Sequence, residues 1–201
     1  MKTNIVLVSL LDRLNKKVAT QLSNDYDLYF ADVADILSYN LVNEGEIEEL
    51  CGADYLKSLK QKTIQEISTY ENTLITIPYT MFFANNTAEY FKQYCTIVFL
   101  KFPQSVLDKI KKTTKKEQTK KDMEMLSLTY DEHTKLCEDV SDVTIELNKS
   151  DFDFCYKKVE KVLDEDKYVV PRVETMETRK TEMASFQLVM KRIGMAIYII
   201  S

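Results

Sequence analysis

Apolar residues in this chain fall into short unbroken runs, separated by stretches in which they recur every three or four positions. Unbroken apolar runs predict buried strands, and the wider spacing predicts amphipathic helices. The predicted strands cover residues 5–11, 27–31, 73–77, 95–102 and 142–147. Because a helical stretch separates each strand from the next, the pattern predicts an α/β fold with a parallel sheet and right-handed crossovers.

The predicted helices are bounded by residues that commonly start or stop helices. Asp12 is expected to cap the first helix, and Asp151 or Ser150 the last. Gly52 predicts a break within a long helical stretch. The helical stretches are 12–23, 33–42, 46–70 with that break, 87–94, 104–112, 126–140 and 151–163.

The 201 residues suit one domain with an extension, which we place at 1–163 and 164–201. In the extension, apolar residues from Phe186 to Ile200 recur at helical spacing and predict an amphipathic helix. Two interpretations stay open for residues 174–200. The helix packs on its own domain, or it forms a homodimer or binds a protein partner.

Composition and charge remove several functional classes. A net charge of −5 disfavours general nucleic-acid binding, which needs a basic face. No apolar run is long enough for a membrane span and no signal peptide precedes the first strand, so we expect a cytoplasmic protein. The four cysteines have no metal-binding spacing, and we expect free thiols and no metal site.

The order of several segments resembles the shikimate kinase-like branch of the P-loop kinases. The segments that carry the resemblance are NIVLVSLL at 4–11, LYFAD at 28–32, GEIEEL at 45–50, TIVFLKFPQSVLDKI at 96–110 and YDEHTKLCEDVSDVTIEL at 130–147. The resemblance covers about residues 3–163. It implies a three-layer sandwich around a five-stranded parallel sheet in the order 2-3-1-4-5.

The phosphate-binding loop of that family, G-x-x-x-x-G-K-[ST], falls on residues 9–16 and is lost. Ser9 and Leu14 stand at the two glycine positions, Asn15 at the lysine and Lys16 at the hydroxyl. The chain has only three glycines, and a leucine side chain would crowd any group of converging N–H donors. Lys16 and Lys17 are the remaining candidates to bind a nucleotide.

The substrate-binding positions of the family are also altered. Asp32 matches the first of two aspartates, whereas the second falls on Ala34, with Asp35 one place later. Leu56 stands where the family has an arginine, and residues 78–80 replace a glycine triplet. Asp32 and Asp35 are therefore the candidate substrate-binding residues.

Arginines, which offset charge in phosphoryl transfer, are nearly missing: Arg13 is the only one before Arg172. We therefore assign no catalytic residue. His133, the sole histidine, is expected on a solvated helix face.

Three further groups of residues carry expectations of their own. Aromatic residues after the third strand are expected to fill the old substrate cleft, and acidic residues near the strand ends could hold a cation. The lysine-rich stretch 109–121 is expected to be solvated, with binding of phosphate or an acidic partner as the alternative. The aromatic residues are Tyr79, Phe82 and Phe83, and the acidic residues are Asp32, Asp35, Glu46, Glu48 and Glu49.

Together these features predict a catalytically inactive relative of shikimate kinase that acts as an interaction or regulatory module and needs no cofactor. The alternative is a divergent small-molecule kinase or nucleotide-binding protein that uses ATP and magnesium through a rebuilt phosphate site. A third hypothesis is a small-molecule sensor that keeps the cleft without the chemistry.

Overall fold

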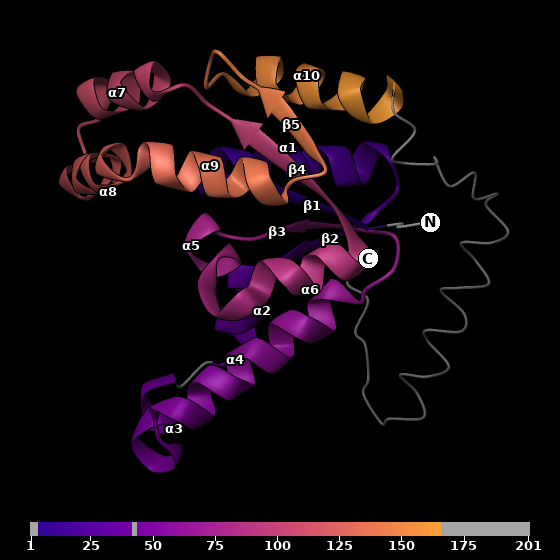
Figure 1. Ribbon diagram of the computed structural model, residues 1–201, viewed down its shortest axis with the longest axis vertical. Helices are drawn as coiled ribbons and strands as arrows, with labels where there is room; N and C mark the ends of the chain where they lie inside the picture. The colour runs from indigo at the N-terminus through magenta and orange to yellow at the C-terminus, as the bar shows by residue number, and fades with distance from the viewer. Residues whose placement is uncertain (1–3, 42–43, 166–201) are drawn as a thin grey trace, which may run out of the picture. The chain divides into compact units, whose positions relative to one another are not determined.

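The computed structural model describes residues 4–41 and 44–165. The predicted helix at 174–200, with its possible dimer or partner contacts, lies outside these residues. The described part contains a single five-stranded sheet with helices on both faces (Figure 1).

All five strands run parallel, in the order β2-β3-β1-β4-β5. This confirms the predicted fold class and strand order. The strands are β1 (Asn4–Ser9), β2 (Tyr29–Asp32), β3 (Thr73–Thr76), β4 (Cys95–Lys101) and β5 (Val143–Glu146).

The central position of β1 explains its unbroken apolar run. Val6 pairs with Ile75 of β3 on one side and with Ile97 of β4 on the other. Val6, Ile75 and Ile97 are fully buried. Both faces of such a covered parallel strand are buried, which favours the continuous hydrophobicity of residues 5–8, with polar residues only at the strand's two ends.

Most described helices match predicted helical stretches. The helices are α1 (Asp12–Asp25), α2 (Val33–Asn40), α3 (Glu44–Cys51), α4 (Ala53–Ser68), α5 (Tyr79–Phe82), α6 (Thr87–Tyr94), α7 (Gln104–Thr113), α8 (Glu117–Leu128), α9 (Tyr130–Val140) and α10 (Phe152–Glu165), with a 3₁₀ turn η1 at Ala84–Asn86. Helix α5 and most of α8 were not predicted, and the stretch predicted at 126–140 is divided between α8 and α9.

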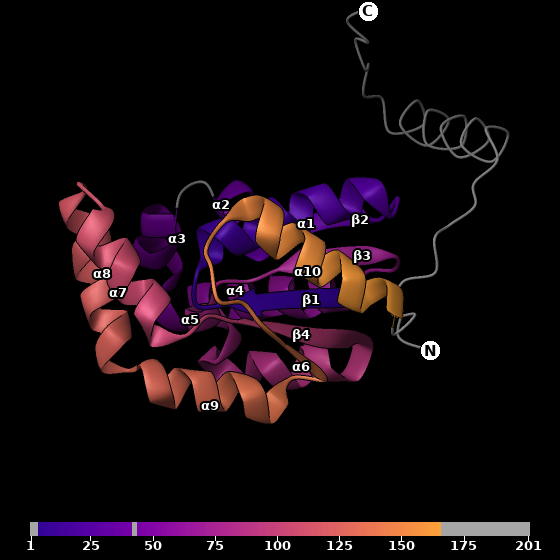
Figure 2. The ribbon, with the colours of Figure 1, turned by 90° about the horizontal axis from the view of Figure 1, so that it is seen from above.

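Two helical layers enclose the sheet. Helices α1 and α10 cover one face, and α6 and α9 cover the other (Figure 2). Across the first layer, the Tyr26 hydroxyl of α1's C-terminal end donates a hydrogen bond to Asp164 of α10 at 2.5 Å. Helix α4 packs against α6, and α3 packs against α4.

Helix α1 starts at Asp12 as predicted, but its capping differs from the prediction. Strand β1 ends at Ser9, and Leu11, not Asp12, occupies the N-cap position, where no side chain caps the helix. Asp12 is the first helical residue, and its carboxylate accepts a hydrogen bond from the backbone N–H of Tyr79 instead. That contact crosses between segments far apart in sequence, so a local capping rule could not find it.

The predicted helix break at Gly52 is confirmed. Gly52 adopts φ +88°, a backbone conformation that side-chain-bearing residues rarely enter, and it separates α3 from α4. No helix within the described ranges combines the length and hydrophobicity needed to cross a membrane.

Candidate functional site

The carboxyl ends of β1, β2 and β3 meet at one cavity of about 270 Å³. In parallel α/β sheets, ligands bind at this end of the strands. The first turn of α1 and the segments that follow β2 and β3 form its walls. The lining residues are Asp12, Arg13, Asn15, Lys16, Asp32, Ala34, Asp35, Thr76, Ile77 and Pro78.

The turn after β1 is closed by its own side chains. The Ser9 hydroxyl accepts a hydrogen bond from the Leu11 N–H at 3.1 Å and donates one to the carbonyl of Leu100 at 3.2 Å. The Asn15 amide nitrogen donates to the carbonyl of Leu7 at 2.8 Å. These bonds use polar groups of the turn within the protein, at the place where P-loop kinases hold phosphate.

Asn15 also leaves one polar atom without a partner. The residue is 2% exposed, and its Oδ1 is buried with no hydrogen bond. A buried acceptor without a donor costs about 1–3 kcal/mol, so such atoms in folded proteins call for an explanation.

Lys16 lies between two carboxylates. Its Nζ is 2.5 Å from Asp35 Oδ2 and 3.4 Å from Asp32 Oδ1. Partial burial acts to lower the pKa of Lys16, but the hydrogen bond to Asp35 and the charges of Asp32 and Asp35 outweigh it and raise that pKa. The structure thus brings Lys16, predicted to bind a nucleotide, into contact with Asp32 and Asp35, predicted to bind a substrate. Lys17 is exposed and lines none of the cavities described here.

Asp32 is held by hydrogen bonds to both of its carboxylate oxygens. Oδ1 accepts from the Asp35 backbone N–H at 2.9 Å, which caps α2, and Oδ2 accepts from the Thr76 hydroxyl at 2.6 Å. The side chain is 8% exposed. Asp32 therefore ties the end of β2 to the end of β3 and helps position Lys16.

Asp12 is the site residue whose role the sequence pattern missed. Much of its side chain is exposed, but the carboxylate is crowded by the chain around the end of β3. This burial raises the pKa of Asp12 to about 6, against the hydrogen bond from the Tyr79 N–H, and the charge of Asp32 adds to the increase. The available signal was the carboxylate of Asp12 itself, which stands in a turn already predicted to lack glycine.

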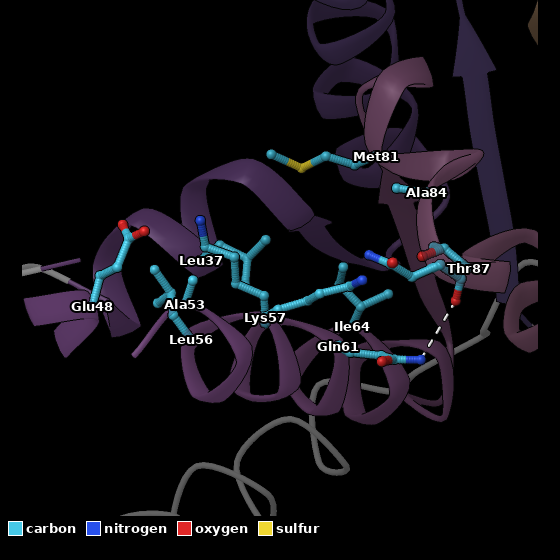
Figure 3. Close-up of a pocket in the computed structure, with 12 residues that line it drawn as sticks. Leu37, Glu48, Ala53, Leu56, Lys57, Gln61, Ile64, Met81, Ala84 and Thr87 are labelled. Carbon is cyan, nitrogen blue, oxygen red and sulfur yellow. Dashed lines mark hydrogen bonds between the residues drawn. The ribbon is translucent and has the colours of Figure 1, made fainter. Parts of the chain in front are cut away.

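A separate groove runs between α2, α4 and α5 (Figure 3). Two adjoining cavities of about 350 and 430 Å³ share Leu37, Lys60 and Met81. The walls of the 350 Å³ cavity are largely apolar, with contributions from Leu56 and Ile64 of α4, whereas those of the 430 Å³ cavity are mixed. Volumes of this size fall in the range of small-molecule sites.

None of the three aromatic residues expected to fill the substrate cleft lines this groove. Phe82 is fully buried and packs against Phe83 and Phe91, with ring centroids 5.2 and 6.3 Å apart. Tyr79 turns away and contacts His133 edge-to-face at 5.1 Å. Within α5 only Met81 lines the groove, because a single helical turn directs neighbouring side chains to different sides.

Two other expectations also need correction. His133 is half-buried against Tyr79, with Nδ1 buried and without a partner, and does not lie on a solvated face. The five carboxylates from Asp32 to Glu49 do not form a cation site: across 4–41 and 44–165, no three metal-binding side chains converge. The acidic residues of α3 are separate in sequence and space from the Asp32–Asp35 pair, which Lys16 already neutralises in part.

The lysine-rich stretch forms the end of α7 and the start of α8. Lys111 pairs with Glu124 of α8 at 3.3 Å, and both side chains are exposed. This agrees with the expectation of a largely solvated stretch.

No protein-family model and no curated protein matches this sequence. Solved structures do resemble the fold. Shikimate kinase from Bacteroides thetaiotaomicron aligns with TM-score 0.63 and 14% identity, covering 82% of this chain and 98% of that one. Shikimate kinase from Aquifex aeolicus gives TM-score 0.61 and 17% identity, covering 82% and 98%.

A third similar structure has another substrate. Dephospho-CoA kinase from Campylobacter jejuni aligns with TM-score 0.56 and 15% identity, covering 82% of this chain and 97% of that one. At such low identities the likeness concerns the fold alone. Strand order and these alignments together show that the chain has the P-loop kinase-like fold of small-molecule kinases.

Proposed function

We propose that this chain is a non-catalytic protein of the small-molecule kinase fold, which acts by binding a ligand or a partner protein. The observation that carries the proposal is the closed turn between β1 and α1. Ser9 accepts the Leu11 N–H, and the Asn15 amide donates to the Leu7 carbonyl. The Leu11 N–H is therefore not free to bind a phosphate, and the Asn15 amide is held against β1.

The charges around the turn support the same conclusion. Phosphoryl transfer depends on positioned cations that offset the charge of the transferred group. Here Lys16 is held by Asp35 and Asp32. Asp12 adds a carboxylate that would repel a phosphate at the same cavity.

Thermal unfolding with millimolar ATP or ADP, with and without magnesium, tests the proposal. A ligand at a hundredfold excess over its dissociation constant stabilises by about 2.7 kcal/mol. We expect no change in melting temperature, while an active shikimate kinase measured in parallel should be stabilised. A clear increase that disappears in Lys16→Ala would establish the alternative, a nucleotide-binding protein with a rebuilt phosphate site.

The open groove favours a second candidate function, the binding of a small molecule as a sensor. Its walls combine apolar side chains with Lys57, Lys60 and Gln61 of α4. A largely preformed apolar pocket with a few polar groups is what small-molecule sites require.

A fragment screen by ligand-detected NMR checks this candidate. Ala84 is exposed at the edge of the groove, so Ala84→Trp should fill the groove without disturbing the core. Hits should compete with one another and be lost in Ala84→Trp. The matched variant Thr113→Trp, exposed at the end of α7, should retain them. Hits that bind both variants equally would contradict a site in the groove.

A further inference from the structure

The cavity at the ends of β1, β2 and β3 holds more acidic than basic side chains. Asp12, Asp32 and Asp35 line it, together with Lys16 and Arg13. Lys16 pairs with Asp35 and Asp32. No ion pair within residues 4–41 and 44–165 involves Asp12, so one carboxylate lacks a close cationic partner.

Asn15 provides an independent indication at the same cavity. It is one of the lining residues, it is almost completely buried, and its Oδ1 accepts no hydrogen bond. Its amide nitrogen is bound to the Leu7 carbonyl, which fixes the orientation of the amide. Oδ1 is therefore an unsatisfied acceptor buried at the cavity wall, which a donor could reach once the turn opens.

These groups select the chemistry of an occupant. A carboxylate and an amide oxygen both accept hydrogen bonds, so the ligand must donate them and should be positively charged. A metal ion does not fit, because no three metal-binding side chains converge in the described ranges. Ile77 and Pro78 add apolar wall, which suits a short hydrocarbon body.

We propose that this cavity binds a small organic cation with N–H donors, a primary ammonium or a guanidinium. Asp12 supplies the opposing charge, and Oδ1 of Asn15 accepts an N–H from the ligand after a small opening of the turn. The site thus has the opposite charge preference from a phosphate-binding loop. The inference goes beyond the proposed function, because a protein that binds no nucleotide need not bind a cation.

Isothermal titration calorimetry on the full chain at pH 7.5 and fixed ionic strength tests the inference. The probes are 1,4-diaminobutane for the ammonium and agmatine for the guanidinium, and their relative affinities distinguish the two groups. Tetramethylammonium, a cation without N–H donors, is the control. We expect saturable binding of at least one N–H-bearing probe and none of the control. Equal binding of all three, or of none, would overturn the proposal.

Variants locate the site. Asp12→Asn keeps the shape of the side chain but removes its charge, and should weaken binding at least tenfold. Asp131→Asn is the matched control, since Asp131 also lies in the first turn of a helix, is exposed and lines none of the cavities described here. Unchanged affinity in Asp12→Asn, or equal losses in both variants, would contradict the assignment.

A measurement on the unmodified protein avoids the risk that a variant loses binding because it misfolds. The side-chain amide resonances of Asn15 should shift on titration with the bound probe, and resonances that do not move would exclude this cavity. Acid should also weaken binding, because protonation of Asp12 removes the charge. The Tyr79 N–H and the charge of Asp32 act directly on the Asp12 carboxylate, and Arg13, Lys16 and Asp35 are the other charged residues that line the cavity.

Discussion

Asn15 shows how one side chain changes the chemistry of a whole turn. At the position of a phosphate-binding lysine, its short amide bonds back to Leu7 of β1. Ser9 performs a similar role through Leu11 and Leu100. The identities of Asn15 and Ser9 were visible in the sequence. Their hydrogen-bond partners were not, because Leu100 of β4 is distant in the chain.

Replacement of Asp12 by Asn should stabilise the protein at neutral pH. Burial raises the pKa of Asp12 from 3.8 to about 6, so the folded state disfavours the ionised carboxylate. The unmodified protein therefore loses stability as pH rises from about 4 to 6. Asn can still accept the Tyr79 N–H without a charge. The gain should be about 1 kcal/mol, allowing for solvent screening of a partly exposed group.

Denaturant unfolding of both proteins at pH 4 and pH 7.5 checks this prediction. The difference in unfolding free energy should be near zero at pH 4 and should favour the variant at pH 7.5. A variant that is less stable than the unmodified protein at pH 7.5 would contradict the proposed environment of Asp12.

Loss of the Asp32 carboxylate should be costly. Asp32→Ala removes the cap of α2 and leaves the buried Thr76 hydroxyl without its partner. We expect a loss of about 2–3 kcal/mol in unfolding free energy. Asp35→Ala is the control: its side chain is 66% exposed, so its ion pair with Lys16 should contribute less than about 1 kcal/mol. Similar losses in both variants would contradict this division of roles.

At the scale of elements, local patterns predicted the strands and helices well. The period of the apolar residues located α6 at 87–94, and Asp151 caps α10 as expected, accepting a hydrogen bond from the Phe154 N–H at 3.0 Å. The failures lie at element ends, in the short α5 and in α8, most of which falls before the helix predicted at 126–140. Helix α5 has only four residues, too few for a period of apolar positions. The sequence therefore could not show that Phe82 faces the core and Met81 the groove.

Two glycines near α3 should respond in opposite ways to alanine. Gly52 has φ +88°, whereas Gly45 lies within α3 without a positive φ, and an added Cβ meets nothing within 4 Å at either site. With ψ 157°, Gly52 lies in an extended positive-φ region, so Gly52→Ala should cost about 1–3 kcal/mol from the backbone alone. Gly45→Ala should stabilise by about 0.5–1 kcal/mol through helix propensity. Thermal unfolding measures both, and a shift of the same sign would contradict the assigned conformations.

At the scale of the whole molecule, a buried parallel sheet supports two different surface features. One is the acidic cavity at the ends of β1, β2 and β3, and the other is the apolar groove between α2, α4 and α5. The fold of small-molecule kinases thus carries two separate cavities of different character here. This arrangement is consistent with the proposal of a binding protein.

The proposed interaction role also makes a prediction for the whole chain. The apolar stripe from Phe186 to Ile200 is expected to mediate self-association or partner binding. Sedimentation equilibrium of the full chain should then show a dimer that is lost on deletion of 174–201. A monomer both before and after the deletion would contradict self-association.

The sequence by itself determined which segments are strands and helices, because the period of apolar residues is a local property of each element. Its resemblance to shikimate kinases supplied the strand order. That residues 9–16 contain no glycine was also visible directly, since it depends only on residue identity.

Only the tertiary structure decided which side chains meet. Lys16 contacts Asp32 and Asp35 because parallel strands bring the turns at their carboxyl ends together, although 19 residues separate Lys16 from Asp35. Tyr79 reaches Asp12 and His133 for the same reason. Charge balance and open space at a site depend on these distant contacts, so no local pattern could provide them.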